Sequence, residues 1–126
     1  MKVLLDTHIL LWWLSDDPSL PSLAADAIAD SEVEVIVSAA TAWEIAIKRA
    51  AGRLEAPDDL LNALEANAFD SLAITAVHAR VAGALPPHHA DPFDRMLIAQ
   101  ARTEGLTLIS IDGRFAAYDV DLLALT

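Results

Sequence analysis

The segment that decides the fold is Lys2-Val3-Leu4-Leu5-Asp6-Thr7-His8-Ile9-Leu10-Leu11-Trp12-Trp13-Leu14. Residues 2–5 are a short apolar run typical of a buried strand, and Asp6 closes it. From Thr7 to Leu14 the apolar residues follow one another too densely for anything but a buried helix. A buried strand that leads directly into a helix predicts the opening of a βα unit.

The same alternation continues along the chain. We predict further strands at residues 33–37, 72–74, 107–111 and 120–123, and helices at residues 20–30, 42–52, 76–84 and 92–104, with another helix that opens at residues 57–59. Alternating strands and helices predict an α/β fold with a mostly parallel sheet, which binds ligands beyond the carboxyl ends of its strands. Residues 1–126 form a single domain in this prediction, since a chain of this length can bury its own core.

Composition limits the classes of function. No apolar run approaches the ~20 residues that span a bilayer, although 55% of the residues are hydrophobic. Asp6 and His8 interrupt the apolar N-terminus, which also lacks a small-residue cleavage site, so we interpret it as structure and not as a signal peptide. The surplus of apolar residues predicts contacts with another subunit or partner. The absence of cysteine excludes disulfides and thiolate metal sites and suits the cytoplasm, where we expect the protein.

Charge argues against nucleic-acid binding by electrostatic attraction alone. Eight Lys and Arg residues stand against nineteen Asp and Glu residues, a net charge of −11, whereas proteins that grip phosphate backbones by charge are basic. A cluster of acids around divalent cations would reverse the local field.

Four acids are placed where such a cluster could form. Asp6 and Asp112 each follow an apolar strand, Glu44 lies early in the helix after the second strand, and Asp94 lies in the first turns of the helix after Pro92. Four carboxylates at one end of a sheet repel one another unless they are protonated or bind cations. Oxygen-only ligands suit Mg²⁺ or Mn²⁺, and such ions assist phosphodiester hydrolysis.

Each acid also has a purely structural interpretation. These are a helix cap for Asp6, a turn with Gly113 for Asp112, a helix-dipole partner for Asp94 and an i,i+4 pair with Lys48 for Glu44. Only the coincidence of all four favours a metal site.

Four blocks of sequence, in this order and spacing, resemble the PIN-domain family and, within it, the VapC-type toxins of bacterial toxin–antitoxin pairs. They are residues 4–8, residues 38–45, residues 91–95 with 98–101, and residues 109–112 with Phe115. The resemblance covers essentially the whole chain. It implies a PIN-like three-layer α/β/α fold and a Mg²⁺-dependent ribonuclease, with Mn²⁺ as a possible substitute. It also implies an RNA substrate, a cognate VapB-type antitoxin and a homodimer.

Carried over by position, the resemblance assigns catalysis and metal binding to Asp6, Glu44, Asp94 and Asp112. Thr7 would support Asp6 or the attacking water, and Ser110 takes the family's small hydroxyl position two residues before the last acid. Asp91 is the other carboxylate of the third block, but we expect it to serve as the helix cap. Arg95 and Arg114 flank the acids and could contact RNA phosphate.

Histidine and tryptophan residues offer weaker signals. The pair His88-His89 near Asp91 looks like a transition-metal cluster, but adjacent side chains diverge, so we predict only a loop near the mouth of the site. We interpret His8 as a hydrogen-bonded structural residue. We expect core or subunit packing, rather than base stacking, for Trp12, Trp13 and Trp43.

Two other functions fit a chain with this alternation. A phosphorylated receiver-like signalling domain would need an acidic pair after the first strand and a late lysine, but here one acid follows that strand and the only lysines are Lys2 and Lys48. A non-catalytic protein-interaction domain with the same fold is the other alternative. Glu44, between Trp43 and Ile45, weighs against it, because burying a carboxylate without a counter-ion is costly.

Overall fold

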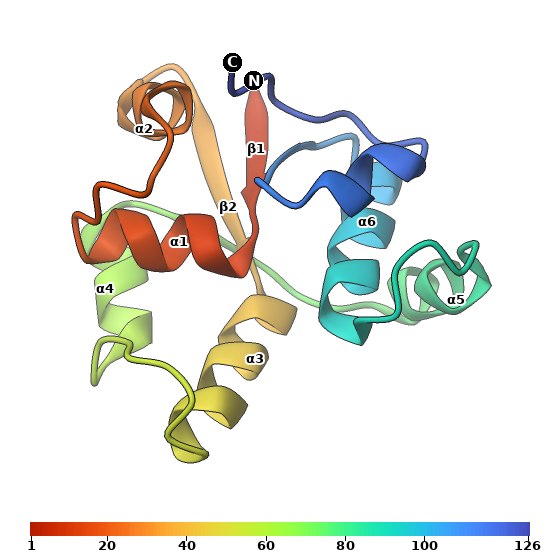
Figure 1. Cartoon of the computed structure of the whole chain (residues 1–126), viewed down its shortest axis with the longest axis horizontal. Coiled ribbons are helices and arrows are strands. Elements are labelled where there is room, and N and C mark those ends of the chain that lie inside the picture. Colours follow the sequence, from red (N-terminus) through yellow and green to blue (C-terminus); the bar gives the residue numbers. More distant parts are fainter.

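The computed structural model describes residues 1–126 and has three layers, with helices on both faces of a central sheet (Figure 1). In chain order its elements are β1 (Lys2–Leu5), α1 (Thr7–Leu14), α2 (Ser22–Ala29), β2 (Glu34–Ser38), α3 (Ala39–Ala50), α4 (Leu60–Ala66), β3 (Asp70–Leu72), α5 (Ala76–Ala84), α6 (Pro92–Glu104), β4 (Thr107–Ile109) and the 3₁₀ helix η1 (Gly113–Ala117). None of the helices has the length and apolarity that crossing a membrane requires.

The sheet is parallel throughout and has the strand order β3-β2-β1-β4. In the register of the central strand, Val3 lies opposite Val35 on one side and Thr107 on the other. The predicted α/β fold with a mostly parallel sheet is therefore confirmed. Parallel pairing places the carboxyl ends of β1, β2 and β4 at one edge, where the acidic residues follow.

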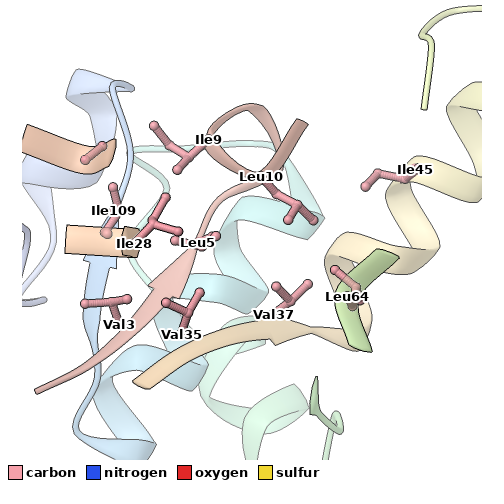
Figure 2. Close-up of a cluster of buried hydrophobic side chains, with 11 residues drawn as sticks. Val3, Leu5, Ile9, Leu10, Ile28, Val35, Val37, Ile45, Leu64 and Ile109 are labelled. Carbon is pink, nitrogen blue, oxygen red and sulfur yellow. The ribbon is translucent and has the colours of Figure 1, made fainter. Parts of the chain in front are cut away.

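Alternating side chains of the strands divide the core into two clusters. Val3, Leu5 and Ile109 face the layer of helices α1 to α4, as the strand and helix side chains in Figure 2 show. Leu4 and Leu108 face the opposite layer, which contains α5, α6 and η1. All five are completely buried, and burial of one such side chain contributes about 1.5–3 kcal/mol. Both faces of the sheet are thus anchored, and the edge that carries the acids is held in place.

Helix caps fix where the chain turns at this edge. Asp6 caps α1 by accepting a hydrogen bond from the Ile9 amide, and Ser38 caps α3. Asp91 caps α6, Pro92 occupies its first turn, and Gly105 ends it in the left-handed region at φ 67°, where a glycine has no steric penalty. The first turns of α1, α3 and α6 consequently lie around the lower end of β1 in Figure 1.

Three predicted strands were wrong in detail. The strand predicted at residues 107–111 ends at Ile109, so residues 110–111 lie outside β4. The third strand is Asp70–Leu72, not residues 72–74, because the residues that pair with β2 are Asp70, Ser71 and Leu72, and Ile74 lies in the connection to α5. Residues 120–123 do not form a strand and make only one bridge, between Leu122 and Leu108. The neighbouring strand β4 is only three residues long, so few of its backbone groups can pair with residues 120–123.

Candidate active site

The four predicted acids line one cleft of about 440 Å³. Asp6 follows β1, Glu44 lies on α3, Asp94 lies in the first turn of α6, and Asp112 caps η1 beyond β4. The cleft is also lined by Thr7, His8, Trp12, Lys48, Asp91, Ile111 and Arg114. The structure thus brings together carboxylates that are separated by up to 106 residues along the chain.

Asp6 lies at the centre of a short hydrogen-bonded chain. Its side chain is almost fully buried, Oδ1 accepts a hydrogen bond from the Ile9 amide at 2.9 Å, and Oδ2 accepts one from the Ser110 hydroxyl. Ser110 Oγ in turn accepts the Asp112 amide at 3.0 Å. Burial raises the pKa of Asp6, and the bonds from Ser110 and Ile9 oppose that rise. Ser110 therefore ties the first acid to the backbone of the last.

Glu44 is also buried and has a partner on each oxygen. The Thr7 hydroxyl donates to Oε1 at 2.5 Å, and the Lys48 ammonium lies 2.5 Å from Oε2. The i,i+4 ion pair is therefore present, and it supplies the counter-ion that a buried carboxylate needs. The Thr7 hydroxyl therefore donates to Glu44 and not to Asp6, whereas the resemblance implied that Thr7 supports Asp6 or the attacking water.

Asp94 is a second acid whose pKa is raised. Burial is the main cause that raises its pKa to about 7, the Asp91 carboxylate adds to the rise, and His89 opposes it. Asp91 is occupied as the cap, since its Oδ1 accepts the amides of Phe93 at 2.8 Å and of Asp94 at 3.1 Å. Asp91 nevertheless lies in the cleft, so its charge affects the site.

The pKa of Asp112 is lowered, in contrast to that of Asp94. The guanidinium of Arg114 donates from Nε and from Nη2, the latter at 2.8 Å from Oδ2. This bond is the main cause that lowers the pKa of Asp112 to about 2, and the same pairing raises the pKa of Arg114. The Arg114 side chain is 61% exposed, so it lies at the rim of the cleft.

Arg95 does not line the cleft. Its guanidinium donates to the carbonyl oxygens of Ala82, Leu85, Pro86 and His89 at 2.8–3.2 Å. All of these carbonyls belong to the end of α5 and the loop that follows it. The structure therefore shows Arg95 as a clamp on this loop, in place of the phosphate contact that its position in the sequence suggested.

His89 is a site residue that the sequence reasoning missed. The loop was predicted correctly, but the His89 side chain is buried, and its Nε2 lies 2.8 Å from Asp94 Oδ2 and 3.2 Å from Asp112 Oδ2. His88, by contrast, is exposed and packs against the Tyr118 ring. The one available signal was the position of His89 two residues before the Asp91-Pro92 cap, where it must lie close to the start of α6.

Aromatic residues border the cleft and the hollow beside it. A second hollow of about 470 Å³ shares His8 and Trp12 with the acidic cleft, and the rings of these two residues lie 5.9 Å apart. His8 is exposed and its ring makes no hydrogen bond within the protein, so its interpretation as a hydrogen-bonded structural residue was wrong. Trp12 and Trp13 pack against the core, as predicted, whereas Trp43 is 59% exposed and its ring meets the Phe93 ring edge-on, with the centroids 5.3 Å apart.

The donor set of the cleft fits a hard divalent cation. Carboxylate oxygens from Asp6, Glu44, Asp94 and Asp112 face one cleft without any thiolate, as Mg²⁺ and Mn²⁺ prefer. The side chains of His89, Asp94 and Asp112 each offer one atom within 4.8 Å of the others. Burial first, and then the charge of Asp91, raise the pKa of Asp94 to about 7 and so disfavour its ionised form, which a bound cation would stabilise.

Comparisons with known proteins agree with this geometry. A family model of the PIN domain matches residues 3–121. Ribonuclease VapC22 of Mycobacterium tuberculosis is 32% identical over 119 residues, which cover 92% of this chain and 91% of that protein.

Solved structures share the fold over nearly the whole chain. A VapBC2 complex of Rickettsia felis, bound to a DNA fragment from its promoter, matches with a TM-score of 0.71 at 14% identity, covering 98% of both chains. A toxin–antitoxin complex from Klebsiella pneumoniae gives 0.70 at 18% identity, again over 98% of both chains. FitAcB from Neisseria gonorrhoeae gives 0.69 at 23% identity over 97% of this chain and 96% of that one.

Proposed function

Because this chain belongs to the PIN domain family, in its VapC-type branch, we propose that it is a divalent-metal-dependent ribonuclease, the toxin of a toxin–antitoxin pair. The observation that carries the proposal is the convergence of Asp6, Glu44, Asp94 and Asp112 on one cleft at the carboxyl edge of the sheet. Family membership also disfavours the receiver-like alternative, whose fold is a different one.

In this proposal the four acids hold Mg²⁺, or Mn²⁺ in its place. When bound, the ion would neutralise the charge of the RNA phosphodiester and lower the pKa of water at the site. The role of the neighbouring side chains is to orient the carboxylates. Thr7 fixes Glu44, and Ser110 fixes Asp6 against the backbone of Asp112.

Two cations of the cleft serve the substrate in this proposal. Lys48 and Arg114 are its only basic side chains besides histidine, in a chain of net charge −11. Arg114 lies at the rim of the cleft, so its guanidinium can contact an RNA phosphate while its hydrogen bond to Asp112 keeps it oriented.

The proposal includes protein partners and location. Trp43 and Ile47, one helical turn apart on α3, are both exposed, and such apolar surface suits contact with a second copy or with a VapB-type antitoxin. The related complexes named above contain toxin and antitoxin together. We further propose that the protein acts in the cytoplasm. The chain has no cysteine, so its fold needs no disulfide and is compatible with a reducing environment.

The direct test is cleavage of a panel of labelled structured RNAs by the antitoxin-free protein, with Mg²⁺ or with EDTA. Asp94→Asn should abolish cleavage, whereas Asp91→Asn should preserve it, because asparagine caps a helix as well as aspartate does. Asp26→Asn is the matched control, since Asp26 is exposed on α2, away from the cleft.

Cleavage that needs metal and fails with Asp94→Asn would support the proposal and identify the third acid. Cleavage that is unchanged by EDTA and by all three substitutions would point to a contaminating nuclease. In that case the non-catalytic interaction domain would become the better interpretation.

A further inference from the structure

His89 lies between two of the proposed metal ligands but is not one of the four acids. Its Nε2 is 2.8 Å from Asp94 Oδ2 and 3.2 Å from Asp112 Oδ2, and its side chain is 1% exposed. Asp94 belongs to α6 and Asp112 to the turn after β4. A single ring nitrogen therefore contacts carboxylates from two separate segments.

The other ring nitrogen fixes the tautomer. His89 Nδ1 accepts a hydrogen bond from the Asp91 backbone amide at 3.2 Å. A nitrogen that accepts a hydrogen bond carries no proton, so the proton of the neutral ring is on Nε2. Nε2–H is then the donor that Asp94 and Asp112 share.

The protein scaffold, and not the acids, sets the position of the ring. The His89 amide donates to the Tyr118 hydroxyl at 2.8 Å, and that hydroxyl donates to the Pro86 carbonyl at 2.7 Å. The His89 carbonyl accepts from Arg95 at 3.2 Å. The ring itself packs against Phe115, with the ring centroids 5.8 Å apart. Every polar group of His89 is thus engaged, and the donor is held in place before any ligand arrives.

We propose that His89 is a positioning residue, whose Nε2–H holds the Asp94 and Asp112 carboxylates side by side and oriented into the cleft for a divalent cation. This role rests on the proposed function. Two carboxylates that share a donor lose part of their mutual repulsion and part of their rotational freedom, so less free energy is spent on ordering them when the cation binds.

The competing role for His89 is direct ligation, since its nitrogen and the two carboxylate oxygens lie within 4.8 Å of one another. Ligation through Nε2 requires that nitrogen to lose its proton. The proton would have to move to Nδ1, which would break the hydrogen bond with the Asp91 amide. The two roles therefore predict different tautomers in the presence of metal.

The test compares His89→Gln with His89→Asn in the full chain. Glutamine places its amide N–H₂ near the position of Nε2, whereas asparagine places it near Nδ1 and does not reach both acids. His88→Gln is the control, because His88 lies in the same loop and is exposed. Mg²⁺ and Mn²⁺ affinities are measured by calorimetry without RNA, and the ring tautomer of the wild type by ¹⁵N NMR with and without Mg²⁺.

We expect His89→Asn to weaken metal binding roughly tenfold or more, the usual effect of losing such a supporting contact, and His89→Gln to retain most of the affinity. The wild-type ring should keep its proton on Nε2 in both states. Equal affinity in all variants would overturn the proposal, as would loss of the Nε2 proton when metal is added. A wild type that binds neither metal would refute the proposed function itself, and the tautomer measured without metal would show separately whether the donor exists.

Discussion

Replacing Asp94 by asparagine should make the metal-free protein more stable at about pH 8. The folded-state pKa of Asp94 is raised from 3.8 to about 7, first by burial and then by Asp91. The unfolded chain therefore loses this proton near pH 4, while the folded chain keeps it until about pH 7. Stability due to the protonated carboxyl is complete below pH 4 and is lost as the pH rises through about 7. Asparagine does not titrate and keeps an acceptor for His89.

The structure gives the size of this effect. A pKa difference from 3.8 to about 7 corresponds to at most roughly 4 kcal/mol, at about 1.4 kcal/mol per pH unit. The Asp94 side chain is 20% exposed, and screening by the water that reaches it reduces the expected gain to about 2 kcal/mol. In a domain of this size that gain raises Tm by roughly 6 °C. About half of it should develop between about pH 5.5 and about pH 8.

The assay is urea unfolding with EDTA at the two pH values, followed by repetition with Mg²⁺. A hundredfold excess of Mg²⁺ over its Kd stabilises the wild type by ~2.7 kcal/mol, so the order of stability should reverse once the variant has lost a ligand. Asp26→Asn controls for the general effect of removing one negative charge. If Asp94→Asn were less stable than the wild type without metal, or if its advantage did not change with pH, the interpretation of Asp94 as an uncompensated ligand would be refuted.

Three further predictions concern the residues that support the acids. Arg114→Ala should raise the pKa of Asp112 from about 2 toward its ordinary value and lower Tm only slightly at neutral pH, because Arg114 is 61% exposed and solvent screens the pair; NMR titration of the carboxyl measures this shift. Thr7→Val should lower the free energy of unfolding by about 1–3 kcal/mol, since it removes a hydroxyl that donates to the buried Glu44; urea unfolding would contradict this if the two curves coincided. Arg95→Met should also destabilise the fold, because four carbonyls lose their donor, yet it should leave the salt dependence of RNA binding unchanged. A weaker salt dependence of RNA binding in Arg95→Met would instead indicate that Arg95 does contact RNA phosphate.

Local sequence chemistry was enough to predict most of the elements. The apolar run of residues 2–5 and the helix after Asp6 have the observed bounds, because a strand and its helix cap are set by neighbouring residues. The Asp91-Pro92 start and the Gly105 end of α6 follow from the same local rules. The edge strand β3 was misplaced, since an exposed strand next to a single neighbour has no strict apolar pattern.

The sequence by itself determined that Asp6 and Asp112 follow strands and that Glu44 and Asp94 lie early in helices, which predicted that all four meet near the carboxyl edge of a parallel sheet. Asp6, Glu44, Asp94 and Asp112 do line one cleft, because strand direction and helix caps are local properties that a parallel sheet converts into proximity. Only the tertiary structure decided the environment of each acid. Arg114 lowers the pKa of one carboxyl while burial and Asp91 raise that of another, and the buried His89 reaches both through a loop whose path depends on Tyr118 and Arg95. Burial and hydrogen bonding between distant segments depend on packing in three dimensions, which no local pattern in the chain encodes.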